Sequence, residues 1–257
     1  MSVITLTTDW GLKDFHVAAL KGSLLSASPA ATIIDITHLI EGNNIAQGAF
    51  IFKNAYEKFP PGTVHIIGVG SFVEKNPEFL LIKNDGHYFI GMNDGFFSLV
   101  FADKPVDMVT LNHSETQFAA YDIKTLVETA RHVLNGNNIY ELGSRPSDFI
   151  EKTIFRPVIE EDVIRGTIVY IDEFGNAITN INRHLFDTQR KERKFEVNAR
   201  RQQYVISLLH KRYDETEQGN LIALFNNSDL LEIAINHGNA SRLLGLKQND
   251  TIRIDFH

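Results

Sequence analysis

The sequence predicts an N-terminal α/β domain with a largely parallel sheet, followed by a smaller all-β, barrel-like domain. Two observations predict this arrangement. In the first half of the chain, apolar β-branched segments alternate with helical segments, as in a sheet whose strands are joined by helices. After about Phe155, strand signals dominate and helical stretches are few and short, which is typical of a small barrel. We therefore expect domains at residues 1–155 and 165–257, joined by a linker at 156–164.

Each expected element of the first domain has a local cause. β-branched and aliphatic residues predict strands at 3–7, 32–36 and 64–69. Helices are expected where an apolar stripe ends at a helix breaker, at 15–27, 44–59 and 123–134. The turn sequence Asn84-Asp85-Gly86 lies between two apolar runs and predicts a hairpin.

The second domain is expected to consist of short strands. Apolar, β-branched runs predict them at 163–171, 195–197, 203–209, 220–225, 231–236 and 251–256. Residues 189–194 carry charges of both signs, which favours a solvated turn over a binding patch.

Composition excludes several classes of function. The chain has 257 residues and a net charge of -7, so a broad basic surface for nucleic acid is not expected. No run approaches the roughly 18 apolar residues of a membrane span, and the N-terminus lacks a signal-peptide pattern, so we expect a cytoplasmic protein without a membrane partner. There is no cysteine, which excludes disulfides and thiolate chemistry. The ten histidines show no paired metal-ligand spacing, so neither a metal site nor a cofactor is expected.

Asp9 is the first candidate binding residue. It follows the strand expected at 3–7, and ligands of open α/β sheets bind outside the carboxyl ends of the strands. A carboxylate there can accept hydrogen bonds from both hydroxyls of a ribose. The alternative is local: Asp9 could form a turn, and Asp14 could cap the next helix. His38 and His65 lie at strand ends in apolar surroundings, and we expect both to make structural hydrogen bonds.

Ordered sequence blocks along nearly the whole chain carry a family resemblance. The first is Thr7-Thr8-Asp9-Trp10-Gly11, and a later one is Phe174-Gly175-Asn176. Further blocks lie at 14, 21–22, 34–38, 61–65, 91–95, 179–181, 227–228, 232–234 and 236–240. In this order the blocks resemble the S-adenosylmethionine hydrolases (hydroxide adenosyltransferases), relatives of the fluorinases and chlorinases.

The resemblance implies contacts for the nucleoside part of S-adenosylmethionine. Asp9 would bind the ribose hydroxyls, and Phe118 would line the pocket around the sugar and the reacting carbon. Phe174 would stack on the adenine, and Asn176 would hydrogen-bond its edge. This inventory suits the ligand, since a sulfonium is attracted to carboxylates and aromatic faces.

The resemblance also implies contacts for the methionine part and an assembly. Asp14 and Asp172 would lie near the methionine ammonium, and Ser228 would hold the amino-acid end. The family forms trimers, so the resemblance implies a homotrimer with the site between subunits.

The family's water-activating set has no counterpart at the corresponding positions. Hydrolases of the family use an Asp-Arg-His set, with Asp and Arg in a loop that falls here on residues 70–77. Without gaps, Gly70 takes the place of the Asp, Pro77 of the Arg and Ala119 of the His. None of these side chains can orient or polarise a water molecule, so the catalytic residues stay unassigned. Charged residues that could substitute lie nearby, at Glu74, Lys75 and Glu78.

Three functions remain open from the sequence. The chain could be an enzyme that cleaves S-adenosylmethionine at the ribose 5′ carbon, giving adenosine or a 5′-substituted adenosine together with methionine. It could instead be a binding protein or sensor that keeps the adenosyl pocket without turnover. The third alternative is a structural trimer whose pocket binds another nucleoside.

Overall fold

The computed structural model describes residues 2–70, 78–112, 123–153, 155–199 and 204–257. The chain divides into two compact units, Met1–Thr153 and Ile154–His257, here called the N-terminal unit and the C-terminal unit. Each unit has its own hydrophobic core.

The N-terminal unit contains a seven-stranded mixed sheet in the order β2-β1-β3-β5-β4-β6-β7. Its strands are β1 (Val3–Thr8), β2 (Thr32–Thr37), β3 (Val64–Gly68), β4 (Phe79–Asn84), β5 (His87–Met92), β6 (Asp107–Leu111) and β7 (Gly143–Ser144). β2, β1, β3 and β5 are parallel, whereas β4, β6 and β7 pair antiparallel. The expectation of a largely parallel sheet is therefore wrong for one half, because the expected hairpin at Asp85-Gly86 reverses the chain between β4 and β5.

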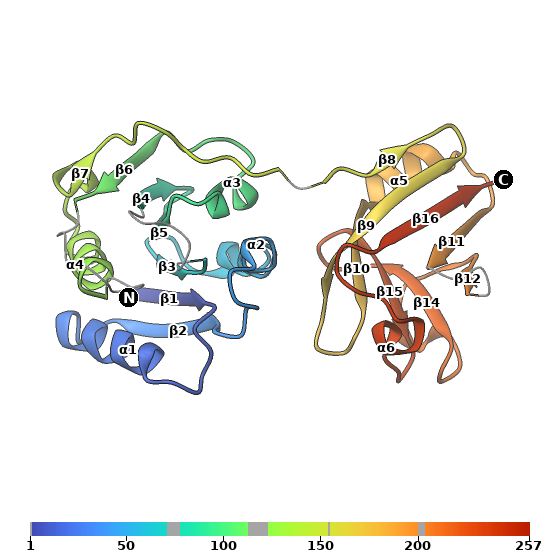
Figure 1. Ribbon diagram of the computed structural model, residues 1–257, viewed down its shortest axis with the longest axis horizontal. Coiled ribbons are helices and arrows are strands. Elements are labelled where there is room, and N and C mark those ends of the chain that lie inside the picture. The colour runs from blue at the N-terminus through green and yellow to red at the C-terminus, as the bar shows by residue number, and fades with distance from the viewer. Residues whose placement is uncertain (1, 71–77, 113–122, 154, 200–203) are drawn as a thin grey trace. The chain divides into compact units, whose positions relative to one another are not determined.

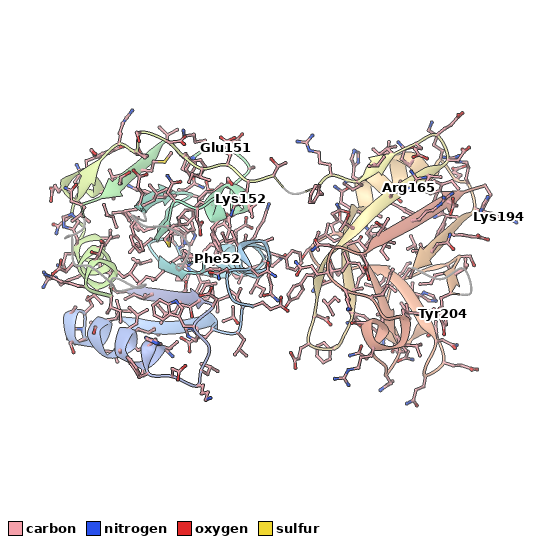
Figure 2. All side chains as sticks on the ribbon, viewed as in Figure 1. Phe52, Glu151, Lys152, Arg165, Lys194 and Tyr204 are labelled. Carbon is pink, nitrogen blue, oxygen red and sulfur yellow. The ribbon has the colours of Figure 1, made fainter. Side chains whose placement is uncertain are left out.

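Helices cover both faces of this sheet. α1 (His16–Ala27) and α4 (Ile123–Leu134) pack on one face, and α2 (Ile45–Lys53) and α3 (Phe96–Val100) pack on the other (Figure 1). Phe52 of α2 is fully buried at the centre of the second layer (Figure 2). The helix expected at 44–59 ends at Lys53, and the backbone N–H and the side chain of its C-cap residue, Asn54, both donate to the carbonyl of Phe50. Two 3₁₀ turns, at Tyr56–Lys58 and Ile139–Glu141, complete the unit.

The four parallel strands end at one edge of the sheet, and polar residues follow them there. Asp9 follows β1, His38 follows β2, Gly70 lies two residues beyond β3, and Asp94 lies two residues beyond β5. This carboxyl edge is where the sequence places the candidate site.

The C-terminal unit is a nine-stranded sheet in the order β12-β11-β16-β9-β10-β15-β14-β13, with β8 beside β9. Its strands are β8 (Val158–Ile159), β9 (Val163–Ile171), β10 (Ala177–Asn182), β11 (Phe195–Ala199), β12 (Val205–Ile206), β13 (Leu209–His210), β14 (Leu221–Phe225), β15 (Leu230–Ile235) and β16 (Thr251–Phe256). β12 lies near β14, although the two are far apart in the strand order, so the sheet curls into a nearly closed barrel around one core. Helices α5 (Arg183–Arg190) and α6 (Ala240–Leu244) and a 3₁₀ turn at Tyr213–Glu215 accompany it.

Three local expectations for this unit need correction. Part of the expected linker, 156–164, forms β8 and the start of β9, which pair in register with each other. The strand expected at 203–209 is two short strands, β12 and β13. The charged run 189–194 begins inside α5, and the turn starts only at Lys191 and Glu192, both with positive φ. In the described ranges, no helix is long and apolar enough to cross a membrane.

Candidate functional site

Asp9 has one carboxylate oxygen fixed by the backbone and one open to a further donor. Its Oδ2 accepts hydrogen bonds from the backbone N–H of Asn43, at 2.9 Å, and of Gly70, at 3.1 Å. Its Oδ1 is buried and has no hydrogen-bond partner among the described residues. A buried carboxylate oxygen is costly without a partner, so this atom is suited to accept from a ligand hydroxyl.

The turn that carries Asp9 is held on both sides. Gly11 has φ +69 and donates its N–H to the carbonyl of His38 at 2.8 Å. The indole of Trp10 is buried so closely against Gly68 that a Cβ there would lie 2.7 Å from Trp10 Cζ2. Asp14 is exposed, and the N-cap of α1 is Phe15 without a side-chain hydrogen bond. The alternative that Asp14 caps this helix is therefore wrong.

A second carboxylate, that of Asp94, lies on the other side of Gly70. Gly70 has φ +79, and a Cβ on it would lie 2.8 Å from Asp94 Oδ2. Asp94 Oδ1 accepts from the backbone N–H of Phe96 at 3.0 Å, which turns Oδ2 towards Gly70. The space for a side chain at position 70 is thus taken by Asp94. Sequence reasoning missed Asp94, although it follows a strand and precedes a glycine, Gly95, as Asp9 follows a strand and precedes Gly11.

Several of the sequence candidates near the reaction centre lie outside the described residues. They are Phe118, Pro77, Ala119, Glu74 and Lys75. Glu78 is described, and its side chain and carbonyl both accept from Asn93, at 3.3 and 2.8 Å. Glu78 therefore stabilises the position of Asn93, the residue that precedes Asp94.

In the C-terminal unit, Asp172 and Asn176 form one closed turn between β9 and β10. Asp172 Oδ1 accepts from the backbone N–H of Asn176 at 2.8 Å, and Oδ2 accepts from its side-chain Nδ2 at 2.9 Å. Phe174 lies at the tip of this turn with 75% of its surface exposed. The turn thus leaves an aromatic face available for stacking.

The segment after β15 packs directly on this turn. Ser241 donates its N–H to the carbonyl of Gly175 at 2.8 Å. Asn239 caps α6 through Arg242 N–H and lies so close that a Cβ on Gly175 would be 2.1 Å from Asn239 Cγ. Two blocks that are far apart in the sequence, 174–176 and 236–240, therefore form one structural feature.

Ser228 lies in an exposed turn. Asn226 links this turn to the buried carboxylate of Glu232. The side-chain oxygen of Asn226 accepts from Ser228 N–H at 3.0 Å, and its Nδ2 donates to Glu232 Oε2 at 3.1 Å. Tyr213 donates to Glu232 Oε1 at 2.7 Å. Burial raises the pKa of Glu232, and the charge of Asp172 raises it further. Asp172 therefore lies close enough for its charge to act on Glu232. Sequence reasoning gave Glu232 no role of its own.

No metal site is formed by the residues that the structure describes, where no three His, Asp or Glu side chains are grouped to hold an ion. The arrangement instead offers carboxylate oxygens, an exposed aromatic ring and backbone donors. The N-terminal unit offers the carboxylates of Asp9 and Asp94, and the C-terminal unit offers the carboxylate of Asp172 and the exposed ring of Phe174.

Comparison with known proteins gives the family. The model of the SAM hydroxide adenosyltransferase N-terminal domain matches residues 4–143, and that of the C-terminal domain matches residues 166–253. The chain therefore belongs to the SAM hydroxide adenosyltransferase family.

Relatives and solved structures match over most of the chain. An (R)-S-adenosyl-L-methionine hydrolase of Methanocaldococcus jannaschii is 29% identical over 100% of this chain and 97% of its own. A fluorinase of Actinoplanes sp. is 25% identical over 70% of this chain and 72% of its own. An uncharacterized conserved protein of Thermotoga maritima has a similar structure, with a TM-score of 0.84, 26% identity and coverage of 99% of this chain and 100% of the other.

Proposed function

We propose that this protein cleaves S-adenosylmethionine at the ribose 5′ carbon, giving methionine and adenosine or a 5′-substituted adenosine. The observation that carries the proposal is family membership along nearly the whole chain, together with a relative named (R)-S-adenosyl-L-methionine hydrolase that aligns from end to end. The fluorinase relative keeps open a nucleophile other than water.

The proposed contacts of the nucleoside use the groups that the two units present. Asp9 Oδ1, which has no partner among the described residues, accepts from the ribose hydroxyls. Phe174 stacks on the adenine, and Asn176, held by Asp172, bonds its edge. Phe118 belongs to this set on resemblance alone.

The proposed contacts of the methionine part use carboxylates and a turn. Asp14 and Asp172 attract the ammonium group, and Ser228 holds the amino-acid end. The presence of Glu232 close to Asp172 supports this assignment, since carboxylates attract a nearby cation.

The proposed reaction is a displacement. The oxygen of water attacks C5′, the C5′–S bond breaks, and its electron pair goes to sulfur, which leaves as the neutral thioether of methionine. The water loses a proton, so a carboxylate near C5′ would assist. The chain's own contribution is in-line positioning and removal of solvent from the nucleophile.

Asp94 is our candidate for that carboxylate. Gly70 cannot supply one, and Asp94 Oδ2 lies 2.8 Å from the point where the Cβ of a side chain at position 70 would be. Asp94 and Asp9 both contact Gly70, so a proton acceptor would lie close to the group that binds the ribose.

We also propose a homotrimer with the ligand site between subunits and a cytoplasmic location. The trimer rests on the family resemblance, and large exposed apolar side chains near the proposed contacts support it: Leu12, Phe15 and Leu39 near Asp9, and Leu243 near Phe174. Light scattering on the purified protein tests it, and a stable monomer that still binds adenosine would refute it.

Incubation of the purified protein with S-adenosylmethionine, followed by chromatography, tests the function. We expect adenosine and methionine to form in equal amounts, or a 5′-substituted adenosine when another nucleophile is supplied. Tight binding of adenosine without any product would identify a binding protein or sensor instead.

A further inference from the structure

A continuous chain of polar contacts runs from the surface to the turn that carries Asp9. Lys21 Nζ lies 2.5 Å from Asp35 Oδ2, and His38 Nε2 lies 3.0 Å from Asp35 Oδ1. His38 Nδ1 lies 2.7 Å from Thr8 Oγ1, which accepts from the backbone N–H of Trp10 at 3.4 Å. Thr8 and His38 are buried, so these contacts are shielded from competing water.

The chemistry of the groups allows a direction to be assigned to these contacts. Lys21 can only donate, and the carboxylate of Asp35 can only accept. A hydrogen on His38 Nε2 is favoured by the charge of the nearby Asp35 carboxylate, although the two atoms lack hydrogen-bond geometry, so we assign Nδ1 of the neutral ring as an acceptor. Thr8 then donates its hydroxyl hydrogen to Nδ1 and uses its oxygen to accept from Trp10. Partial burial acts to raise the pKa of Asp35, but the interactions with Lys21 and His38 outweigh it and lower that pKa, in keeping with an ionised acceptor.

His38 holds the turn on both sides of Asp9. Its side chain binds Thr8, the residue before Asp9, and its carbonyl accepts from Gly11, two residues after Asp9. The path of the chain between these two points sets the direction of the Asp9 carboxylate. Because Oδ2 is also fixed by two N–H groups, a small rotation of the turn would move Oδ1 away from a ligand.

We propose that His38, through Thr8, is a positioning residue that aims Asp9 Oδ1 at the ribose hydroxyls. This inference rests on the proposed function, in which Asp9 binds the ribose. His38 does not touch the ligand, and its effect is on affinity through the geometry of the turn.

The chain contains a matched control for this proposal. Thr5 also lies in β1, is fully buried, and has its Oγ1 at 2.7 Å from a histidine Nδ1, that of His65. That pair continues to His87, and the side-chain hydrogen bonds described for it do not involve residues 8–11. Thr5→Val and Thr8→Val therefore remove the same group from the same strand, and both leave a buried ring nitrogen without its partner.

The experiment compares wild type, Thr5→Val, Thr8→Val and Thr8→Ser. Thermal midpoints report stability, calorimetry gives the Kd for adenosine, and steady-state assays with S-adenosylmethionine give KM and kcat. We expect both valine variants to lose similar stability. Only Thr8→Val should raise the Kd and KM, by about tenfold, with a smaller change in kcat, and Thr8→Ser should restore them.

Equal changes of Kd in Thr5→Val and Thr8→Val, or none in either, would overturn the positioning role. If Thr8→Val does not fold, His38→Asn and His38→Gln decide the matter. The side chain of Asn places an acceptor near the position of Nδ1 for Thr8, and that of Gln does not. His38→Asn should therefore bind adenosine more tightly than His38→Gln. Equal Kd values for these two variants would contradict the proposal. A wild-type protein that binds adenosine but forms no product refutes the proposed function, while the comparison of Kd values still tests His38.

Discussion

Replacement of Asp9 by asparagine separates the binding role of this residue from its role in the fold. The carboxylate receives two backbone hydrogen bonds on Oδ2, from Asn43 and Gly70, while Oδ1 faces no donor among the described residues. The amide of asparagine can place its single oxygen towards the two N–H groups. Its NH₂ group then takes the place of Oδ1 and can no longer accept from a ribose hydroxyl.

The expected losses of adenosine affinity and of stability in Asp9→Asn follow from the hydrogen bonds that change. A hydrogen bond to a charged group contributes about 1.5–3 kcal/mol, and each 1.4 kcal/mol is about tenfold in affinity. Asp9→Asn should therefore weaken adenosine binding about tenfold to a hundredfold. The two backbone bonds are retained, though to a neutral acceptor, so the loss of stability should stay below about 1 kcal/mol.

Calorimetry with adenosine and urea denaturation measure the two effects separately. Asp9→Ala is the companion variant, because it also leaves the two N–H groups without their acceptor and should lose stability as well as affinity. An Asp9→Asn protein that binds adenosine as tightly as wild type would remove Asp9 from the site.

Three further predictions concern stability and turnover. Burial, assisted by the charge of His87, lowers the pKa of His65 from 6.5 to about 3, so the unfolded chain takes up a proton first as the pH falls. The stabilisation is complete above pH 6.5, and we expect about 2 kcal/mol to be lost between pH 7 and pH 5 in wild type but not in His65→Gln, as measured by denaturant titration; equal slopes would contradict this. Asp94→Asn keeps the acceptor for Phe96 N–H but loses the proton-accepting charge, so kcat should fall about 10²–10⁴-fold, whereas a fall below threefold in a product assay would exclude Asp94 as the base. Gly175→Ala places a Cβ against Asn239 at φ +82 and should cost about 1–3 kcal/mol in urea denaturation, more than Gly219→Ala, where φ is +88 but the space is open; equal costs would mean that the contact is unimportant.

The sequence predicts elements well where periodicity and a breaker agree. α1 ends before Pro29, and the hairpin forms at Asp85-Gly86. α3 was missed because five residues are too short to show a helical period. β10 was missed because its sequence, with Thr179 and Asn180, lacks a strong apolar alternation; its pairing with β9 and β15 stabilises it.

In the candidate site too, features with a local sequence signal could be predicted and features that depend on tertiary contacts could not. Asp9 became a candidate from its place directly after a strand together with the family resemblance, and its role as a ligand contact stays a prediction. The structural hydrogen bonds expected for His38 and His65 are confirmed. Asp94 also follows a strand, but its proximity to Gly70 depends on β5 pairing beside β3, a contact that no local pattern encodes. The anchoring of Ser228 by Glu232 likewise depends on a side-chain network within the folded unit.

The central claim is that this chain cleaves S-adenosylmethionine although Gly70 stands at the position where the family resemblance implies a carboxylate. The most direct measurement is a time course of adenosine and methionine formed from S-adenosylmethionine by wild type, beside the Methanocaldococcus jannaschii relative under the same conditions. We predict equal amounts of the two products, formed at a rate that depends on Asp94. Saturable binding of adenosine with no product from wild type, while the relative turns over, would contradict the claim.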